Sequence, residues 1–359
     1  MSILIGGDIF YYVKKNDSNK INISNKLLKK IRMNDNFIVN LEGPITNSCI
    51  QKEKIGINLK NPIFLARELR RIGVTIAGIS NNHIMDFGVS GLEDTIKICN
   101  DNNITCVGAG NKLCIAQNHV LINDEGSETM IIAVSEDEFC WAKENSSGTN
   151  PLDIMLFYWK YQKLIKEIPN SIVLIHGGKE YLKIPSPRMR NISKFMVDMG
   201  VDLVVWQHSH CIGCYEHYKE KLIFYGQGNF VFNYPDQSED FYNGVLIKFS
   251  SKKDKRYEFI FIKQDPDTKN IEEIPNLNER EYELPKENTD IFVKNEWNKI
   301  CKYYEPFFLK ELSEIKFNQY TEENGTLDVH SRENLFKLHN LLKYESNLEV
   351  ILTILDNLV

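Results

Sequence analysis

The feature that most constrains the fold is an alternation of short apolar runs with helix-like stretches through about residue 250. Runs such as SILIGGD, NFIVNLE, VTIAGIS, SIVLIHGG and VDLVVWQ indicate strands that are buried on both faces. Because strand and helix alternate, neighbouring strands are expected to pair in parallel, which predicts an α/β layered fold. After residue 220 the runs follow one another without helices, so we expect antiparallel pairing there.

Capping residues mark the expected helices. Asn61 followed by Pro62 predicts a helix start, and Gly73 predicts the end of that helix after LARELRRI. Ser186 and Gly200 delimit another helix in the same way. The stretches SGLEDTIKICND and DIMLFYWKYQKLIKEI are also predicted to be helical.

The composition of the chain changes near residue 263, where it becomes polar and contains prolines. We expect a domain over residues 1–262, a polar, proline-containing linker over 263–288 and a helical appendage over 289–359, where the apolar residues have amphipathic spacing. The appendage either caps the sheet or provides a surface for a partner, such as a second copy in a homo-oligomer.

Composition narrows the possible partners. The 359 residues carry a net charge of -6, which argues against nucleic acid as a partner. No apolar stretch is long enough to predict a transmembrane segment, and the start MSILIGGDIF lacks the pattern of a signal peptide, so we expect a cytoplasmic protein. The eight cysteines are then reduced thiols. For the pair Cys211 and Cys214, ordinary small residues are favoured over a zinc or redox site.

Polar side chains collect where the predicted strands end, which is where ligands bind in α/β sheets. In chain order they are Asp8 after ILIGG, Glu42 after FIVNL, Asn81, Asn82 and His83 after TIAGIS, His176 after SIVLI, and His208 and His210 after DLVVWQ.

This mixture of donors predicts a metal site. Imidazole and carboxylate together suit Zn, Fe, Mn or Co, and two neighbouring cations need a shared anion, for which Glu42 is the natural bridge. The spacing of His208 and His210 places both rings on one side of an extended chain. For each residue taken alone, a hydrogen-bonded structural role is the alternative.

His83 has a different setting, because Asp86 follows it by three residues. A carboxylate that orients an imidazole raises its basicity, so His83 could protonate a leaving group. The alternative is that Asp86 starts a helix and accepts from backbone amides.

At this point the chain resembles the poly-γ-glutamate capsule synthesis protein CapA family, a branch of the calcineurin-like metallophosphoesterase superfamily. The resemblance covers about residues 3–250, and its motifs occur in order: GGDIF, VNLEGPIT, GISNNHIMDFGVSGLEDT, NITCVGAG, HGGKEY, DLVVWQHSHCIGCYE and IFYGQGNFVFN. It implies a four-layer α/β/β/α sandwich that binds two divalent metal ions, such as Mn, Fe or Zn.

The resemblance also implies residue roles. Asp8 and His210 would hold the first metal, and Glu42 would bridge. Asn82, His176 and His208 would hold the second metal, and His83, with Asp86, would act as the acid. The remaining motif positions would contact substrate: Asn81, Glu180, Tyr181, Glu216 and Asn229.

Three positions depart from the family pattern. Phe10 stands where the superfamily has a metal-binding histidine, Gln207 replaces a histidine before the H-x-H pair, and Gly177 replaces a common tryptophan. The first change weakens the first metal site. The other two alter the pocket wall, which leaves the substrate open.

Three functions are compatible with these residues. The chain could hydrolyse a phosphoester or an amide bond of a γ-glutamyl or cell-surface polymer precursor, with metal-activated water and His83 as acid. It could instead be a non-catalytic binding or assembly protein of a capsule pathway. The carboxylates Glu180 and Glu216 favour an amine or amide over an anionic phosphate.

Overall fold

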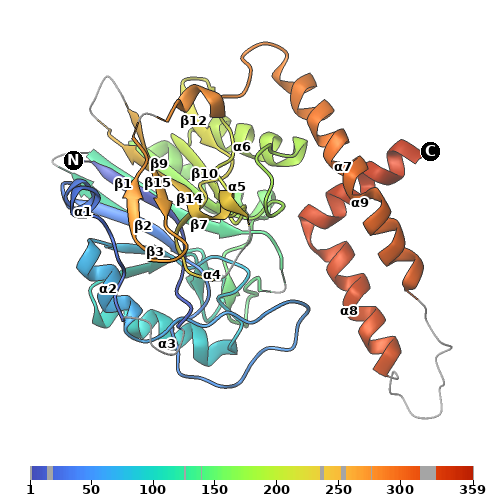
Figure 1. Ribbon diagram of the computed structural model, residues 1–359, viewed down its shortest axis with the longest axis horizontal. Coiled ribbons are helices and arrows are strands. Elements are labelled where there is room, and N and C mark those ends of the chain that lie inside the picture. The colour runs from blue at the N-terminus through green and yellow to red at the C-terminus, as the bar shows by residue number, and fades with distance from the viewer. Residues whose placement is uncertain are drawn as a thin grey trace.

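The computed structural model describes residues 2–13, 19–124, 127–138, 140–234, 238–251, 256–275, 277–315 and 329–358. In this part of the chain two large β-sheets pack face to face, and helices cover the outer face of each sheet (Figure 1). The predicted four-layer α/β/β/α sandwich with C-terminal helices is confirmed.

The first sheet has the strand order β16-β15-β14-β1-β2-β3-β4, and β13 also pairs with β1. Strands β1 to β4 and β13 run parallel, whereas β14, β15 and β16 are antiparallel additions. Antiparallel pairing was predicted for this later part of the chain. The bounds are β1 (Ile3–Phe10), β2 (Asn36–Leu41), β3 (Ile76–Gly78), β4 (Thr105–Val107), β13 (Asn229–Phe232), β14 (Asn243–Phe249), β15 (Tyr257–Gln264) and β16 (Ile271–Glu273).

The second sheet has the order β11-β12-β10-β9-β7-β6. Its four central strands are parallel, and an antiparallel strand closes each edge. A short pair, β5 (Ala109–Gly110) with β8 (Gly148–Thr149), lies outside both sheets. The bounds are β6 (Val120–Asp124), β7 (Ser127–Ser135), β9 (Asn170–His176), β10 (Leu203–Gln207), β11 (Tyr215–Tyr218) and β12 (Lys221–Phe224).

Alternation along the central strands builds the layers. In β2, Phe37 and Val39 face the helices of the first sheet, whereas Ile38 between them faces the second sheet. In β9, Leu174 faces the first sheet and Ile175 faces the helices on the other side. Every inner strand therefore needs apolar residues at consecutive positions, which explains the continuous apolar runs in the sequence.

The helices follow the predicted boundaries with one exception. Ser186 caps α6 by accepting a hydrogen bond from the Met189 amide, and Gly200 ends that helix in the left-handed conformation. The prediction that Asn61 starts a helix is wrong, because α2 begins four residues later, at Leu65. The helices that cover the sheets are α1 (Asn25–Arg32), α2 (Leu65–Ile72), α3 (Gly88–Asp101), α5 (Ile154–Glu167) and α6 (Pro187–Met199), and α4 (Leu113–Ala116) is a short turn of helix.

The C-terminal helices α7 (Thr289–Glu314), α8 (Val329–Lys343) and α9 (Glu345–Leu358) form a lobe beside the sandwich (Figure 1). The lobe has its own apolar cluster, which includes Trp297, Phe308 and Ile351. The predicted linker 263–288 contains β16, which pairs with β15 and so belongs to the first sheet. Residues 316–328 of the predicted appendage lie outside the described part of the chain.

Polar contacts join this lobe to the sandwich. Arg188 at the start of α6 bonds to Glu136 after β7 and to Glu349 of α9, where Nε lies 3.3 Å from the carboxylate. Lys343 of α8 pairs with Asp137 at 2.6 Å. The lobe therefore contacts the loops that follow β7 and β9. Among the described helices, none is long and apolar enough to cross a bilayer.

Candidate metal centre

The carboxyl ends of the parallel strands of both sheets meet along one rim of the sandwich. The first sheet contributes Asp8 near the end of β1 and Glu42 directly after β2. The second sheet contributes His176, the last residue of β9, and His208, the first residue after β10. Residues far apart in the sequence thus meet at one place, as the strand-end pattern predicts.

One group at this rim consists of Asp8, Glu42 and His210. One ligand atom from each of the three buried residues lies within 4.8 Å of the others. The Nδ1 atom of His210 is 3.7 Å from Asp8 Oδ2, and its Nε2 atom is 3.8 Å from Glu42 Oε1. These separations leave room for a cation between the donors.

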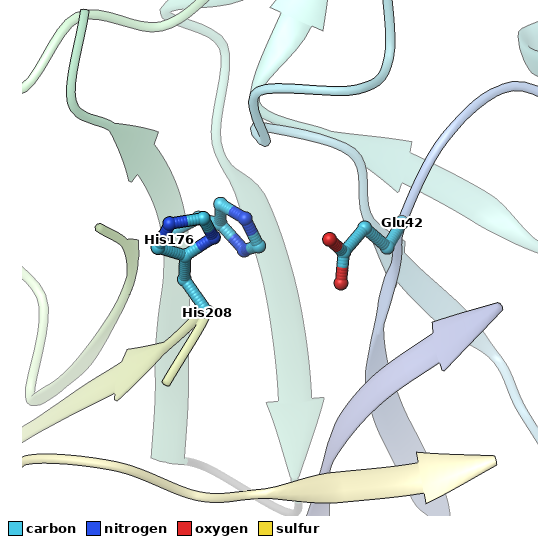
Figure 2. A group of neighbouring side chains, drawn as sticks. All are labelled: Glu42, His176 and His208. Carbon is cyan, nitrogen blue, oxygen red and sulfur yellow. The ribbon is translucent and has the colours of Figure 1, made fainter. Parts of the chain in front are cut away.

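A second group consists of Glu42, His176 and His208, again with ligand atoms within 4.8 Å of one another. Figure 2 shows the two imidazoles side by side, with the Glu42 carboxylate facing them across a gap. The ring centroids of His176 and His208 are 4.6 Å apart. Glu42 belongs to both groups, which is the position that a bridging carboxylate requires.

Hydrogen bonds fix how His210 presents its nitrogens. The side-chain amide of Asn229 donates to the Phe241 carbonyl at 2.8 Å, so its oxygen is the atom that faces His210 Nδ1 at 3.0 Å. That oxygen can only accept, and His210 therefore carries its proton on Nδ1. Its bare Nε2 points toward Glu42, which is the tautomer needed to bind a metal there.

Two asparagines orient His176. The amide nitrogen of Asn40 donates to Asp8 Oδ1 at 2.8 Å and lies 3.2 Å from His176 Nδ1. The Nε2 atom of His176 lies 3.0 Å from the side-chain oxygen of Asn82. The Asn82 oxygen can only accept, so His176 Nε2 carries the ring proton here, and a cation bound between Asn82 and His176 would take the place of that proton.

The buried carboxylates of the centre would be stabilised by bound cations. Burial raises the pKa of Asp8, and it raises the pKa of Glu42 well above its ordinary value, to which the charge of Asp8 also contributes. Burial likewise holds the pKa of His176 well below its usual range, so this imidazole is neutral. Buried carboxylates beside neutral imidazoles are costly alone and are stabilised by bound cations.

Two atoms that could bind a metal are buried and have no hydrogen-bond partner among the described residues: Glu42 Oε2 and His208 Nδ1. Such atoms are rare in folded proteins unless a ligand satisfies them. Together with the mixture of carboxylate, amide and imidazole donors, they fit a pair of divalent cations with Glu42 shared between them.

His83 lies next to this centre and is oriented as predicted. Its Nδ1 atom is 2.7 Å from Asp86 Oδ2, and its Nε2 atom faces Glu42 Oε1 at 3.9 Å. Asp86 also accepts from the Leu59 amide at 2.7 Å, so it serves both the imidazole and the backbone. Burial lowers the pKa of His83, and the hydrogen bond to Asp86 opposes this shift.

The backbone at the rim is strained. His208 has φ +88°, His210 has φ +51° and Tyr181 has φ +63°, all in the left-handed region that side chains other than glycine rarely adopt. Such conformations persist where the surrounding structure holds them, and they occur often at functional sites. Here they aim both histidines of the H-x-H pair at the same centre.

The structure places four of the predicted substrate-contact residues as follows. Glu180 Oε1 lies 3.8 Å from His208 Nε2 at the open side of the centre. The half-exposed ring of Tyr181 has its centroid 6.2 Å from that of His210. Asn229 is buried behind His210, which favours a positioning role. Asn81 is fully buried, accepting from the Gly43 amide and donating to the Leu41 carbonyl, so it too holds the rim in place.

The prediction that Glu216 lines the site is wrong. Glu216 lies in the edge strand β11, and its two oxygens accept from the Arg190 guanidinium at 2.7 and 2.8 Å. The Tyr225 hydroxyl donates to the same carboxylate at 2.6 Å. Because its neighbour Tyr215 faces the space between the sheets, alternation turns Glu216 outward, toward α6.

Sequence reasoning missed three residues at the centre. Glu138 follows β7, accepts from the Asn82 amide at 2.7 Å and lies 3.5 Å from His208 Nε2. Its position after an apolar strand was a usable signal. Lys54 pairs with Asp86 at 2.5 Å, but it lies in an irregular loop that no sequence pattern marks. Asn40 lies within a strand and not at its end, so its position did not indicate a site residue.

The three departures from the family pattern have structural explanations. The Phe10 ring packs against Phe232, at 5.2 Å between centroids, and supplies no ligand. The Gln207 amide donates to the Gly6 carbonyl at 3.2 Å. A Cβ at Gly177 would lie 2.5 Å from the Glu136 side chain, so Gly177 makes room for the ion pair of Glu136 with Arg188.

The cysteines of the C-x-x-C pair, Cys211 and Cys214, are both buried free thiols.

The sequence matches a protein-family model described as bacterial capsule synthesis protein PGA_cap, over residues 2–234. It is 32% identical over 190 residues to the capsule biosynthesis protein CapA of Bacillus anthracis, covering 51% of this chain and 46% of that protein. It is 31% identical over 207 residues to the PGA biosynthesis protein CapA of Bacillus subtilis, covering 56% and 54%. The matched region thus spans about half the length of these relatives.

Solved structures with a similar arrangement are more distant. A putative 5'-nucleotidase from Staphylococcus aureus has a TM-score of 0.47 at 11% identity and covers 82% of this chain and 58% of that one. A phosphatase from Mycoplasma pneumoniae has a TM-score of 0.44 at 14% identity, with coverage of 77% and 95%.

Proposed function

This chain belongs to the bacterial capsule synthesis protein PGA_cap family, and we propose that it is a metal-dependent hydrolase that acts in the synthesis of a capsule or another cell-surface polymer. The observation that carries the proposal is the sharing of Glu42 between two groups of buried donors. A carboxylate common to both groups is what a pair of cations needs in order to lie close together.

We assign the donors to two positions. Asp8, Glu42 and His210 would hold one divalent ion, and Glu42, Asn82, His176 and His208 would hold the other. Divalent metals in such sites act as Lewis acids and lower the pKa of water. The buried Asp8 and Glu42 make the sites selective for cations, and Asn229 keeps the bare nitrogen of His210 turned inward.

His83 is the proton donor in this proposal. Asp86 holds the ring through Nδ1, which leaves Nε2 directed at the space beside Glu42. When a bond is cleaved there, Nε2 gives a proton to the leaving atom, and the Asp86 carboxylate stabilises the charged imidazole that must form before that transfer. Lys54 pairs with Asp86 and holds it in place.

We favour an amide as the bond that is cleaved. The oxygen of water adds to the carbonyl carbon and one of its protons passes to solvent. The C–N bond breaks, and the nitrogen leaves as an amine after taking a proton from His83, which solvent then replaces. Glu138 and Glu180 both lie close to His208 Nε2, at 3.5 and 3.8 Å. Two carboxylates at this position repel an anionic phosphate and suit an amine. A γ-glutamyl linkage fits this chemistry, and the relative from Bacillus subtilis is a PGA biosynthesis protein.

A non-catalytic role in polymer assembly is the second candidate, and Phe10 favours it. Its ring lies in an apolar cluster, and the His, Cys, Asp and Glu side chains of the described residues then supply three donors for the first cation: Asp8, Glu42 and His210. A weakly held cation there would leave the chain able to bind the polymer without cleaving it.

The test is metal analysis of the purified protein, followed by turnover with added Mn²⁺ of γ-glutamyl amides and of aryl phosphomonoesters and phosphodiesters. The proposal expects two metals per chain and cleavage of the amides. His83→Ala should keep the metals and lose turnover. Protein that binds two metals but cleaves only phosphoesters would contradict the amide assignment, and protein that binds none would favour the assembly role.

A further inference from the structure

A cavity of about 600 Å³ lies beside the candidate metal centre, between the sandwich and helix α8. Four lysines line it: Lys52 and Lys54 from the loop after β2, Lys143 from the segment after β7, and Lys343 from α8. The volume is typical of sites for small molecules or for a few units of a polymer.

The cavity gathers positive charge in a chain whose net charge is -6. Its lining includes two carboxylates, Glu53 and Asp137, against the four lysines. Asp137 is already paired with Lys343. Lys143 is exposed and forms no ion pair with any of the described residues. Lys54 is likewise paired, with Asp86 outside the lining. Lys52 and Lys143 therefore remain against the one carboxylate of Glu53, which leaves the lining with a net positive charge.

The chemistry of the lining indicates the kind of anion. No arginine lines the cavity, so the flat, two-pronged guanidinium that grips a single phosphate or carboxylate is missing among the described lining residues. The lysines come from three segments of the chain, and Trp141, Leu113 and Leu156 form an apolar wall between them. Separate point charges around an apolar surface suit a chain of methylene groups that carries single negative charges at intervals.

The cavity is also linked to the reacting centre. Lys54 lines the cavity, and its Nζ atom lies 3.2 Å from His83 Nδ1. Asp137, on another wall, precedes Glu138, which faces His208. A substrate whose reacting bond lies beside Glu42 therefore has its next units within reach of the lysines.

We infer that this lysine-lined cavity binds the carboxylates of an anionic polymer chain, and that helix α8 completes the site with Lys343. The inference rests on the proposed function, because it names the substrate class of the same centre. It adds a role for the C-terminal lobe, which lies outside the part of the chain that matches the family model.

The test measures binding apart from catalysis. A short γ-linked glutamate oligomer is titrated into the full-length, metal-free protein by calorimetry at low ionic strength. The comparison ligand is the same oligomer with its carboxylates converted to amides. We expect the acidic oligomer to bind and the amidated one not to bind, with affinity that falls as salt is added, since exposed charges are screened.

Two variants locate the binding. Lys143→Glu reverses one exposed charge and is expected to weaken binding about fivefold, and Lys343→Ala, which also leaves Asp137 unpaired, is expected to do at least as much. Lys302→Glu, on an exposed part of α7, is the matched control and should bind as the wild type does.

Equal binding of the acidic and amidated oligomers, or unchanged affinity in both cavity variants, would overturn the inference. Because metal-free protein is used, these results do not depend on turnover. A protein that hydrolyses amides but fails this test would lack the carboxylate site, whereas one that passes it without turnover would lose only the proposed reaction.

Discussion

The ion pair behind His83 gives a prediction whose size follows from the structure. Asp86 is 1% exposed, its Oδ1 atom lies 2.5 Å from Lys54 Nζ in an ion pair, and its Oδ2 atom accepts from the Leu59 amide. Removing one partner of a buried ion pair costs about 3 to 5 kcal/mol. Asp86→Asn keeps the shape and can still accept from Leu59, so we expect the free energy of unfolding to fall by about 3 kcal/mol.

A second substitution separates stability from catalysis. Lys54→Met in the Asp86→Asn background removes the unpaired buried ammonium, so it should restore about 2 kcal/mol or more of the loss. Turnover should not return, because the imidazole still lacks the carboxylate that stabilises its charged form. We expect turnover to be about a hundredfold below wild type in both proteins.

The assays are urea unfolding of metal-free protein, metal analysis and turnover of whichever amide the wild type cleaves. Metal content should be unchanged, because neither Lys54 nor Asp86 is assigned as a ligand. Wild-type turnover in Asp86→Asn would refute the positioning role of Asp86. Equal stability of the single variant and the wild type would refute the buried ion pair.

Three further predictions concern the centre and its connection to the C-terminal lobe. His210→Ala should lower the metal content by elemental analysis, since it removes one of three donors at the first position, and unchanged content would remove His210 from the site. Arg188→Met should lower the free energy of unfolding by about 2 kcal/mol, because among the described residues it leaves the buried Glu136 carboxylate with the Gly178 amide alone as partner. Burial raises the pKa of Glu345 from its ordinary value of 4.5 to about 7. An acid whose pKa is raised by folding keeps its proton in the native state after the unfolded chain has lost it, so stability falls as pH rises from 4.5 to 7. Glu345→Gln should therefore have the melting temperature of the wild type near pH 4 and a higher melting temperature than the wild type at pH 8. A variant that melts at the wild-type temperature at both pH values would contradict the raised pKa.

Much of the fold could be predicted because the physical signals are local. Continuous apolar runs such as residues 37–39 and 172–175 are required by strands that are covered on both faces. Ser186 and Gly200 signalled helix ends through backbone chemistry alone. Asn61 misled for a tertiary reason: its side chain accepts from the Tyr11 amide and donates to the Glu42 carbonyl, so it holds two strand ends and does not cap a helix.

The candidate site was predictable where position along a strand decides it. Asp8, Glu42, His176 and His208 all lie at the carboxyl ends of parallel strands, which must meet at one rim. Glu216 could not be placed in the same way, because the answer depends on which face of β11 turns inward.

Lys54 and the cavity it lines were beyond reach of the sequence for another reason. They depend on an irregular loop and on helix α8, which is separated from that loop by almost the whole chain. The packing of the C-terminal lobe against the sandwich has no signature in local patterns.

The sharing of Glu42 by two cations is tested most directly by anomalous diffraction from crystals of the full chain grown with Mn²⁺. The account predicts two anomalous peaks, both within bonding distance of the Glu42 carboxylate. One peak should also contact Asp8 and His210, and the other His176 and His208. Crystals with a single peak, or with peaks that do not contact Glu42, would contradict it.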